Sequence, residues 1–176
     1  MYPFVRMIKE MARARRMPRL GLFDSHVSHH RCWPWDLDLW MELNNGRTLT
    51  LYDLGRLPLA RRTAIESVLR DKGWGMTVAG STIRYRRRVT VFAQFTMHTR
   101  CIGWDRRFIY MEQSMWQGDE CTSHALIRKA IVSKAGMVPP AELAAAMGAD
   151  PVSPPLSDWV QAWIDAEVIH PWPPAR

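Results

Sequence analysis

The spacing of hydrophobic residues predicts a short helix in the first part of the chain and a strand after it. Four apolar residues recur at helical spacing between residues 4 and 17, with Arg and Lys on the other faces: Val5, Ile8, Met11 and Ala12. Pro18 ends this helix because proline lacks the backbone donor that a helix needs. Residues 22–33 then alternate in the manner of a β-strand.

A longer helical pattern runs to about Lys72. Its apolar positions share one spacing: Leu49, Tyr52, Leu57, Ala60, Ala64, Val68 and Leu69. Pro58 lies inside the pattern, so we expect it to kink the helix or to split it in two. Gly55 costs about 1 kcal/mol of helix propensity. We therefore expect another element to approach the helix closely at Gly55.

After Gly73 the period changes to two, which is typical of strands. The pattern predicts four strands, followed by two short helices: strands 76–86, 89–101, 106–117 and 119–134, and helices 139–148 and 156–168. Gly118-Asp119 is suited to a tight hairpin turn. Consecutive antiparallel strands with one long helix inserted after the first strand indicate an α+β domain. The apolar character of the helix suggests that the sheet curls around it.

The length of 176 residues suits one domain over residues 1–176. We expect a basic helix over 1–19, a core over 20–135 and a helical extension with a tail over 136–176. No run of about 18 apolar residues is present, so we expect no membrane span. The sequence also shows no secretory signal, and its three cysteines are odd in number and widely spaced. These features predict a reducing, cytoplasmic location.

Charge is distributed unevenly along the chain, whose net charge is +7. Residues 1–20 carry six basic side chains and one acidic side chain, whereas residues 139–175 carry five acidic side chains and no Lys or Arg. The helix over residues 4–17 has two interpretations: a membrane-surface or targeting helix, or a helix that lies on the domain. Its narrow apolar face favours the second interpretation.

The segment RYRRR, residues 84–88, is a dense basic cluster between two predicted strands. Nucleic-acid binding would use such a patch with interleaved aromatic side chains, but no recognised nucleic-acid-binding motif accompanies it. We therefore expect no nucleic-acid partner. Two interpretations remain, a solvated strand end and a docking site for the phosphates of a nucleotide-bearing cofactor.

The segment HVSHHRC, residues 26–32, raises the question of a zinc site. On a strand, His26 and His30 are about 13 Å apart at roughly 3.3 Å per residue, so they cannot share one metal. His30 and Cys32 would need two further ligands that no neighbouring motif supplies. We expect no metal site, and we expect these histidines to lie at a surface or an interface.

Residues 35–47, WDLDLWMELNNGR, hold three carboxylates among Trp, Leu and Met side chains. Charged groups are costly in apolar surroundings unless they are paired or used. A carboxylate walled by Trp35, Trp40 and Met41 is suited to act as a base or a nucleophile. Free amides at the start of the following helix are suited to hold an oxyanion.

The competing interpretation of this stretch is structural. In that interpretation Asp36 or Asp38 caps the loop, and Asn44 or Asn45 is the N-cap of the helix. Asp53, further inside the helix, offers another carboxylate.

DLDLWMELNNGRTLTLYDLGR, residues 36–56, resembles the hot-dog-fold thioesterases of the 4-hydroxybenzoyl-CoA thioesterase-like branch. Their pattern is an Asp, a short loop, Val-Asn-Asn, an aromatic residue and an acid on the following helix. GWDRRFIYMEQ (103–113) and GMVPPAEL (136–143) are similar to an acyl-CoA thioesterase-like subgroup that includes the thioesterase superfamily member proteins of animals. The resemblance extends from about residue 20 to 165. Met41-Glu42 departs from the usual Gly-His, and Thr48 stands where the aromatic residue is usual.

The resemblance implies an α+β hot-dog fold. In that fold an antiparallel sheet of five or six strands wraps around a long central helix, here from Asn45 to Lys72. A short N-terminal helix and short C-terminal helices would complete the domain. The resemblance also implies a homodimer or a homotetramer whose active sites lie at the dimer interface.

The implied activity is hydrolysis of an acyl-CoA or acyl-carrier-protein thioester. Asp38 would act as general base or nucleophile, amides near Asn45 and Gly46 would polarise the carbonyl, and Asp53 falls on the helix acid. The basic cluster would meet the phosphates of the substrate: Arg84, Arg86, Arg87 and Arg88. No metal is needed, and coenzyme A enters only as part of the substrate. The alternative is an inactive hot-dog protein that binds acyl thioesters or serves as an assembly module. In either case Asp36 is expected to be structural.

Overall fold

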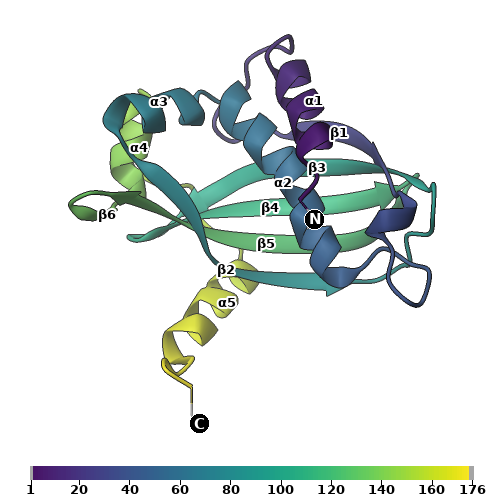
Figure 1. Ribbon diagram of the computed structural model, residues 1–176. Coiled ribbons are helices and arrows are strands. Elements are labelled where there is room, and N and C mark those ends of the chain that lie inside the picture. Colours follow the sequence, from purple (N-terminus) through teal and green to yellow (C-terminus); the bar gives the residue numbers. More distant parts are fainter. Residues whose placement is uncertain (1, 175–176) are drawn as a thin grey trace.

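The computed structural model describes residues 2–174 and consists of one curled antiparallel sheet with helices on both faces (Figure 1). The strands are β1 (His26–Arg31), β2 (Gly75–Tyr85), β3 (Gln94–Trp104), β4 (Phe108–Gln117), β5 (Glu120–Ser133) and β6 (Gly136–Val138). They are arranged in the order β1-β3-β4-β5-β2, and β6 pairs with β5. Strand β2 is therefore an edge of the sheet.

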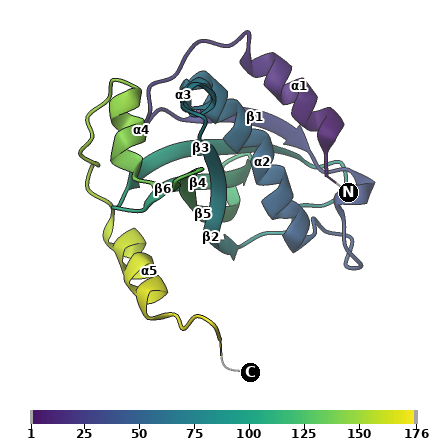
Figure 2. The same ribbon diagram turned by 60° about the vertical axis from the view of Figure 1, so that its left-hand side comes forward.

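The helices are α1 (Phe4–Ala14), α2 (Asn45–Arg62), α3 (Ile65–Lys72), α4 (Pro140–Ala146) and α5 (Asp158–Ile169), with a short 3-10 helix at Pro34–Asp36. Helix α2 lies across the concave face of the sheet, and α1 lies beside it (Figures 1 and 2). Helix α5 packs on the opposite face, where Val160 is buried against Tyr110 and Leu126. The α+β hot-dog fold expected from the resemblance is confirmed.

The central helix ends at a different place from the one expected. Helix α2 continues through the buried Pro58 and ends at Arg62, so the expectation that Pro58 splits the helix was wrong. The break lies at Thr63 and Ala64, where Ala64 adopts a left-handed φ of 66° before α3 begins. The Thr63 hydroxyl donates to the carbonyl of Leu59 and so helps to close the last turn of α2. The expected single helix from Asn45 to Lys72 is therefore two helices.

The predicted strands are confirmed, with changes at their ends. β2, β4 and β5 lie within two residues of their predicted bounds, whereas β3 begins at Gln94 and β1 is limited to His26–Arg31. Gly118, with φ 58°, forms the turn between β4 and β5. The three-residue strand β6 was not predicted, because a segment so short has no readable period.

Two of the three histidines of β1 are buried within the chain, so the expectation of a surface or an interface was wrong for them, whereas His29 is exposed. His26 and His30 are buried on the concave face, where His26 Nδ1 contacts Arg62 Nη1 at 2.9 Å and His30 Nε2 contacts Ser28 Oγ at 2.8 Å. Burial, together with a smaller effect of neighbouring cations, lowers the pKa of His26 to about 4 and that of His30 to about 3. Both imidazoles are therefore neutral at pH 7.

Helix α1 lies on the domain, as its sequence favoured. The face that it buries is not the apolar face expected from the sequence. Met7, Glu10 and Ala14 pack inward, whereas Val5 and Ile8 face solvent. Asp36 explains this orientation, since Arg6 reaches it across the interface between α1 and the 3-10 helix. The tertiary contact selects the face of the helix that is buried.

Candidate active site at the start of the central helix

Asp36 fixes the segment that leads into α2. Its side chain is fully buried and accepts from Arg6 Nη1 and Arg47 Nε, each at 2.7 Å, and from the Trp33 amide at 3.0 Å. Its carbonyl accepts from the amide of Asn44 at 3.0 Å. Because one carboxylate joins α1, the 3-10 helix and α2, the expectation that Asp36 is structural is confirmed.

Helix α2 begins with two amides that have no acceptor among the described residues. Asn44 is the N-cap: its Oδ1 accepts from the Arg47 amide at 3.0 Å, and its carbonyl accepts from the Thr48 amide at 2.8 Å. The remaining first-turn amides are those of Asn45 and Gly46. They point out of the positive end of the helix dipole, where an anion or a carbonyl oxygen is favoured.

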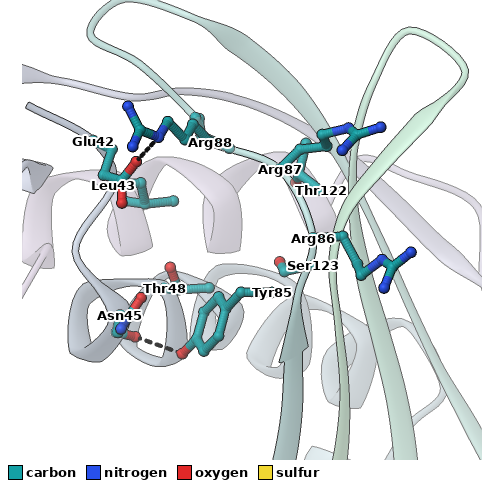
Figure 3. Close-up of a pocket in the computed structure, with 11 residues that line it drawn as sticks. Glu42, Leu43, Asn45, Thr48, Tyr85, Arg86, Arg87, Arg88, Thr122 and Ser123 are labelled. Carbon is teal, nitrogen blue, oxygen red and sulfur yellow. Dashed lines mark hydrogen bonds and ion pairs between the residues drawn. The ribbon is translucent and has the colours of Figure 1, made fainter.

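A pocket of about 210 Å³ opens beside this helix start (Figure 3). It is lined by Glu42, Leu43, Asn45, Thr48, Tyr85, Arg86, Arg87, Arg88, Val89, Thr122 and Ser123. These residues come from the loop before α2, the first turn of α2, the end of β2 with the loop that follows it, and the start of β5. Four segments far apart in the sequence therefore form one polar pocket.

Hydrogen bonds and ion pairs hold the walls of this pocket in place. The Tyr85 hydroxyl donates to the carbonyl of Asn45 at 3.0 Å, and burial raises the pKa of Tyr85, so it remains a donor at neutral pH. Arg88 pairs with Glu42 at 2.8 Å, and Arg87 pairs with Glu120. Arg86 is exposed and its backbone amide donates to the carbonyl of Thr122. The pocket therefore has arginine side chains along its rim and the N-terminus of α2 beside it.

Asp38 does not line this pocket within one chain. It lies in a tight turn in which its Oδ1 accepts from the Trp40 amide at 2.9 Å and its own amide donates to the carbonyl of Glu42. Trp35, Trp40 and Met41 are exposed, so the apolar wall expected around a carboxylate here is absent in the single chain. Asp38 is half-buried, and no ion pair engages it in the described part of the chain.

Asp53 and Arg84 lie away from the pocket. Asp53 is eight residues into α2, roughly 12 Å along the helix from Asn45, and pairs with the buried Arg56 at 2.5 Å. Arg84 precedes Tyr85 on β2 and therefore faces the other side of the sheet. The structure thus brings Asn45 and three of the four predicted arginines to one pocket and separates them from Asp53 and Arg84. Gly46 follows Asn45 in the first turn of α2 but does not line the pocket.

Sequence reasoning missed four polar side chains of the pocket: Thr48, Tyr85, Thr122 and Ser123. Tyr85 had one signal, as the aromatic residue inside RYRRR, and Thr48 was noted only as a departure from the family pattern, whereas Thr122 and Ser123 are ordinary strand residues. Glu42 was noted only as a departure from the family pattern, and the structure places it in the pocket wall. Across residues 2–174 no group of three His, Cys, Asp or Glu side chains is arranged to hold a metal ion.

Comparison with known families places the chain in a defined group. A family model described as the thioesterase-like superfamily matches residues 32–164, which is most of the chain. The sequence is 32% identical to Protein THEM6 of Xenopus laevis over 111 residues, covering 62% of this chain and 54% of that protein. It is 31% identical to Protein THEM6 of Drosophila melanogaster over 91 residues, covering 51% and 47%. The match therefore spans about half the length of these relatives.

Solved structures with the same fold carry thioesterase names. The YbaW probable thioesterase from Escherichia coli superposes with a TM-score of 0.64 at 16% identity, covering 69% of this chain and 95% of that one. A putative oleoyl thioesterase from Lactobacillus plantarum gives 0.63 at 15% identity, covering 73% and 52%. The DHNA-CoA thioesterase from Staphylococcus aureus gives 0.57 at 10% identity, covering 82% and 92%. At these identities the likeness is one of fold.

Proposed function

Because the chain belongs to the thioesterase-like superfamily, we propose that it hydrolyses an acyl thioester carried by coenzyme A or by an acyl-carrier protein. One observation supports this proposal most directly. The two first-turn amides of α2 that have no acceptor in the described part of the chain, at Asn45 and Gly46, lie beside a pocket rimmed by Arg86, Arg87 and Arg88. Such a site offers donors for a carbonyl oxygen and cations for phosphates within one cleft.

In the proposed reaction the thioester carbonyl oxygen accepts from the amides of Asn45 and Gly46. Asp38 takes a proton from water, and the resulting hydroxide adds to the carbonyl carbon. The C–S bond then breaks, and the thiolate leaves and regains the proton from Asp38. Asp38 suits the role of base because no cation within residues 2–174 pairs with it, whereas Glu42 is held by Arg88. The reaction needs no resident cofactor or metal.

We further propose that a second copy of the chain completes the site. Strand β2 ends the sheet, and Val78 on this strand and Leu57 on α2 are exposed apolar side chains. An unpaired edge strand of eleven residues favours pairing with another edge. A homodimer or homotetramer joined there would supply the wall that Asp38 lacks in the single chain. Cytoplasmic location stays a prediction.

The direct test is a hydrolysis screen over short, medium, long and aromatic acyl-CoA thioesters. We expect turnover of at least one class, and a loss of about 100-fold or more in kcat for Asp38→Asn, as expected when a general base is removed. Glu42→Gln is the matched control on the same loop, and it should lower kcat much less. Unchanged kcat in Asp38→Asn would refute the role of Asp38.

One observation favours the second candidate, an inactive protein that binds acyl thioesters. The Asp38 carboxylate caps a turn and stands outside the pocket in which the arginines gather. This candidate predicts no turnover in the screen, together with saturable binding of a non-hydrolysable thioether analogue of acyl-CoA by calorimetry. Binding without turnover would establish it, and absence of both would refute the acyl thioester assignment.

A further inference from the structure

The outward face of α1 carries large apolar side chains that are mostly exposed to solvent. Phe4, Val5 and Ile8 leave 66, 82 and 68% of their surface exposed, although they lie on a helix whose other side is well packed. Lys9 on the same helix is exposed next to this face, and Arg16 in the turn after the helix is also exposed. An amphipathic helix that turns its apolar stripe to solvent and borders it with cations suits the interface of a lipid bilayer.

A second group of exposed apolar side chains lies at the same end of the molecule. Trp35 and the tip formed by Leu39, Trp40 and Met41 are each between 62 and 95% exposed. The ion pair between Arg6 and Asp36 joins α1 to this loop. The N-terminal end of α1 and the loop after β1 lie next to each other in both views (Figures 1 and 2).

A ring contact and a shared surface pocket link Phe4 on α1 to Trp35 on the loop after β1. Phe4 packs on Tyr2 with ring centroids 4.9 Å apart, and Tyr2 lines one surface pocket together with Trp35. Trp35 stacks on Trp33 at 5.4 Å. We call the exposed members nearest α1 the apolar end surface: Phe4, Val5, Ile8 and Trp35. The tip of residues 39–41 adjoins Asp38, where we propose the second copy of the chain, and is not part of this surface. Trp side chains are enriched at the membrane interface, where one end of the ring system is apolar and the other is wet.

A cationic pocket of about 280 Å³ lies beside the apolar end surface, between α1 and β1. It is lined by Arg6, Lys9, Glu10, His29, His30, Arg31, Trp33 and Gln94. Arg31 lies 5.9 Å from the centroid of the Trp33 ring. His30 is neutral, and Glu10 is the one acidic side chain among the residues that line the pocket. Lys9 and Arg31 therefore leave this pocket positive and suited to a phosphate.

We propose that the apolar end surface docks on a bilayer that contains anionic lipids, with the α1–β1 pocket holding a lipid phosphate. Complementarity of charge supports this occupant, because exposed apolar side chains stand directly beside a positive pocket. The docking is peripheral, since no helix in residues 2–174 has the length and hydropathy to cross a bilayer.

The test is co-sedimentation of the full chain with vesicles of phosphatidylcholine alone and with roughly 30% phosphatidylserine added. We expect at least tenfold stronger binding to the anionic vesicles, and loss of most of that gain in about 0.5 M NaCl, where the Debye length is short. Equal binding to the two kinds of vesicle, or none to either, would overturn the proposal.

Two pairs of variants separate this surface from any other exposed apolar group. Val5→Ser with Ile8→Ser should weaken binding about tenfold or more, because the docked protein would bury these two aliphatic side chains in the bilayer. The matched control is Val168→Ser with Ile169→Ser on α5, whose side chains are 79 and 82% exposed and should leave binding unchanged. Lys9→Gln should weaken binding about fivefold, whereas Lys134→Gln, exposed elsewhere, should not.

Sedimentation velocity of the same variants distinguishes a bilayer from a second copy of this chain. If Val5→Ser with Ile8→Ser dissociates an oligomer and leaves vesicle binding unchanged, the surface is a contact between copies and the proposal is wrong. If oligomeric state is unchanged and vesicle binding falls, the bilayer is the occupant.

Discussion

Gly55 of α2 lies against Thr99 of β3 so closely that a Cβ on Gly55 would stand 2.3 Å from the Thr99 Oγ1. The same Cβ would be 2.9 Å from the sulfur of Met97. The Thr99 Oγ1 accepts from Gln113 Nε2 at 2.9 Å, so it cannot move aside without breaking a buried hydrogen bond. This contact sets how deeply the helix carrying the candidate site sits in the sheet.

We predict that Gly55→Ala destabilises the protein by about 1 to 3 kcal/mol, because overpacking outweighs the gain in helix propensity. Urea unfolding measures this change in the free energy of unfolding. In the Gly55→Ala, Thr99→Ala double variant the loss should be smaller than the sum of the two single losses. Additive losses would show that the two residues do not collide.

We predict that Asp36→Asn lowers the free energy of unfolding by about 3 kcal/mol, because it leaves Arg6 and Arg47 without a buried counter-charge. The control is Asp71→Asn, since the Asp71 carboxylate pairs with Arg70 while both side chains are mostly exposed. Thermal or urea unfolding measures the free energy of unfolding of the two variants and of the wild type. Equal stability of the two variants would contradict the central role given to Asp36.

Glu112 on the convex face predicts an acid-dependent loss of stability. A hydrogen bond from His124 and the ion pair with Arg100 lower the pKa of Glu112 to about 2 from the usual 4.5. A lowered carboxyl pKa stabilises the fold above the unfolded value, and that stability is lost as pH falls from about 4.5 to about 2. The contribution is at most about 3 kcal/mol.

Urea midpoints of wild type and Glu112→Gln between neutral pH and pH 2 check this prediction. The difference between the two proteins should shrink below pH 4.5 and vanish near pH 2. Buried neutral His26 and His30 lower stability below about pH 6.5 in both proteins, so the comparison between variants removes their effect. A difference that is independent of pH would contradict the assignment.

Arg86 and Arg84 provide a matched pair for the proposed phosphate contacts. Arg86 lines the pocket beside α2, whereas Arg84 faces the other side of the sheet. For a thioester of coenzyme A that the screen identifies, Arg86→Ala should raise KM about fivefold and Arg84→Ala should not. With the corresponding acyl-pantetheine, which lacks the nucleotide phosphates, neither variant should change KM. A rise that persists with acyl-pantetheine would exclude the phosphate role.

Local pattern was sufficient for most of the fold. Period-two alternation located β2 to β5, and the helical spacing of apolar residues located α2, because the side chains of both elements meet one continuous core. The close approach at Gly55 was also predictable, since a glycine inside a helix is costly unless a neighbour needs the space. The order of the motifs, together with the family resemblance, identified the hot-dog arrangement.

The errors arose where contacts between distant segments override local preference. The break of the central helix lies at Ala64 and not at Pro58, because a buried proline can be accommodated while the turn into α3 needs a left-handed residue. His26 and His30 were expected at a surface or an interface, but they are neutral and buried within the chain. In the site, Asp53 and Arg84 share the predicted segments but point elsewhere, which depends on side-chain direction in three dimensions.

The sequence by itself determined the class of fold, the family and the position of the helix start at Asn44–Gly46, since each depends on residues close together in the chain. Only the tertiary structure decided that Glu42, Tyr85 and the 86–88 arginines share one pocket, because their segments meet through strand pairing. It also decided that α1 buries Met7, Glu10 and Ala14 and exposes its other apolar stripe, because the Arg6–Asp36 ion pair holds the helix in that orientation.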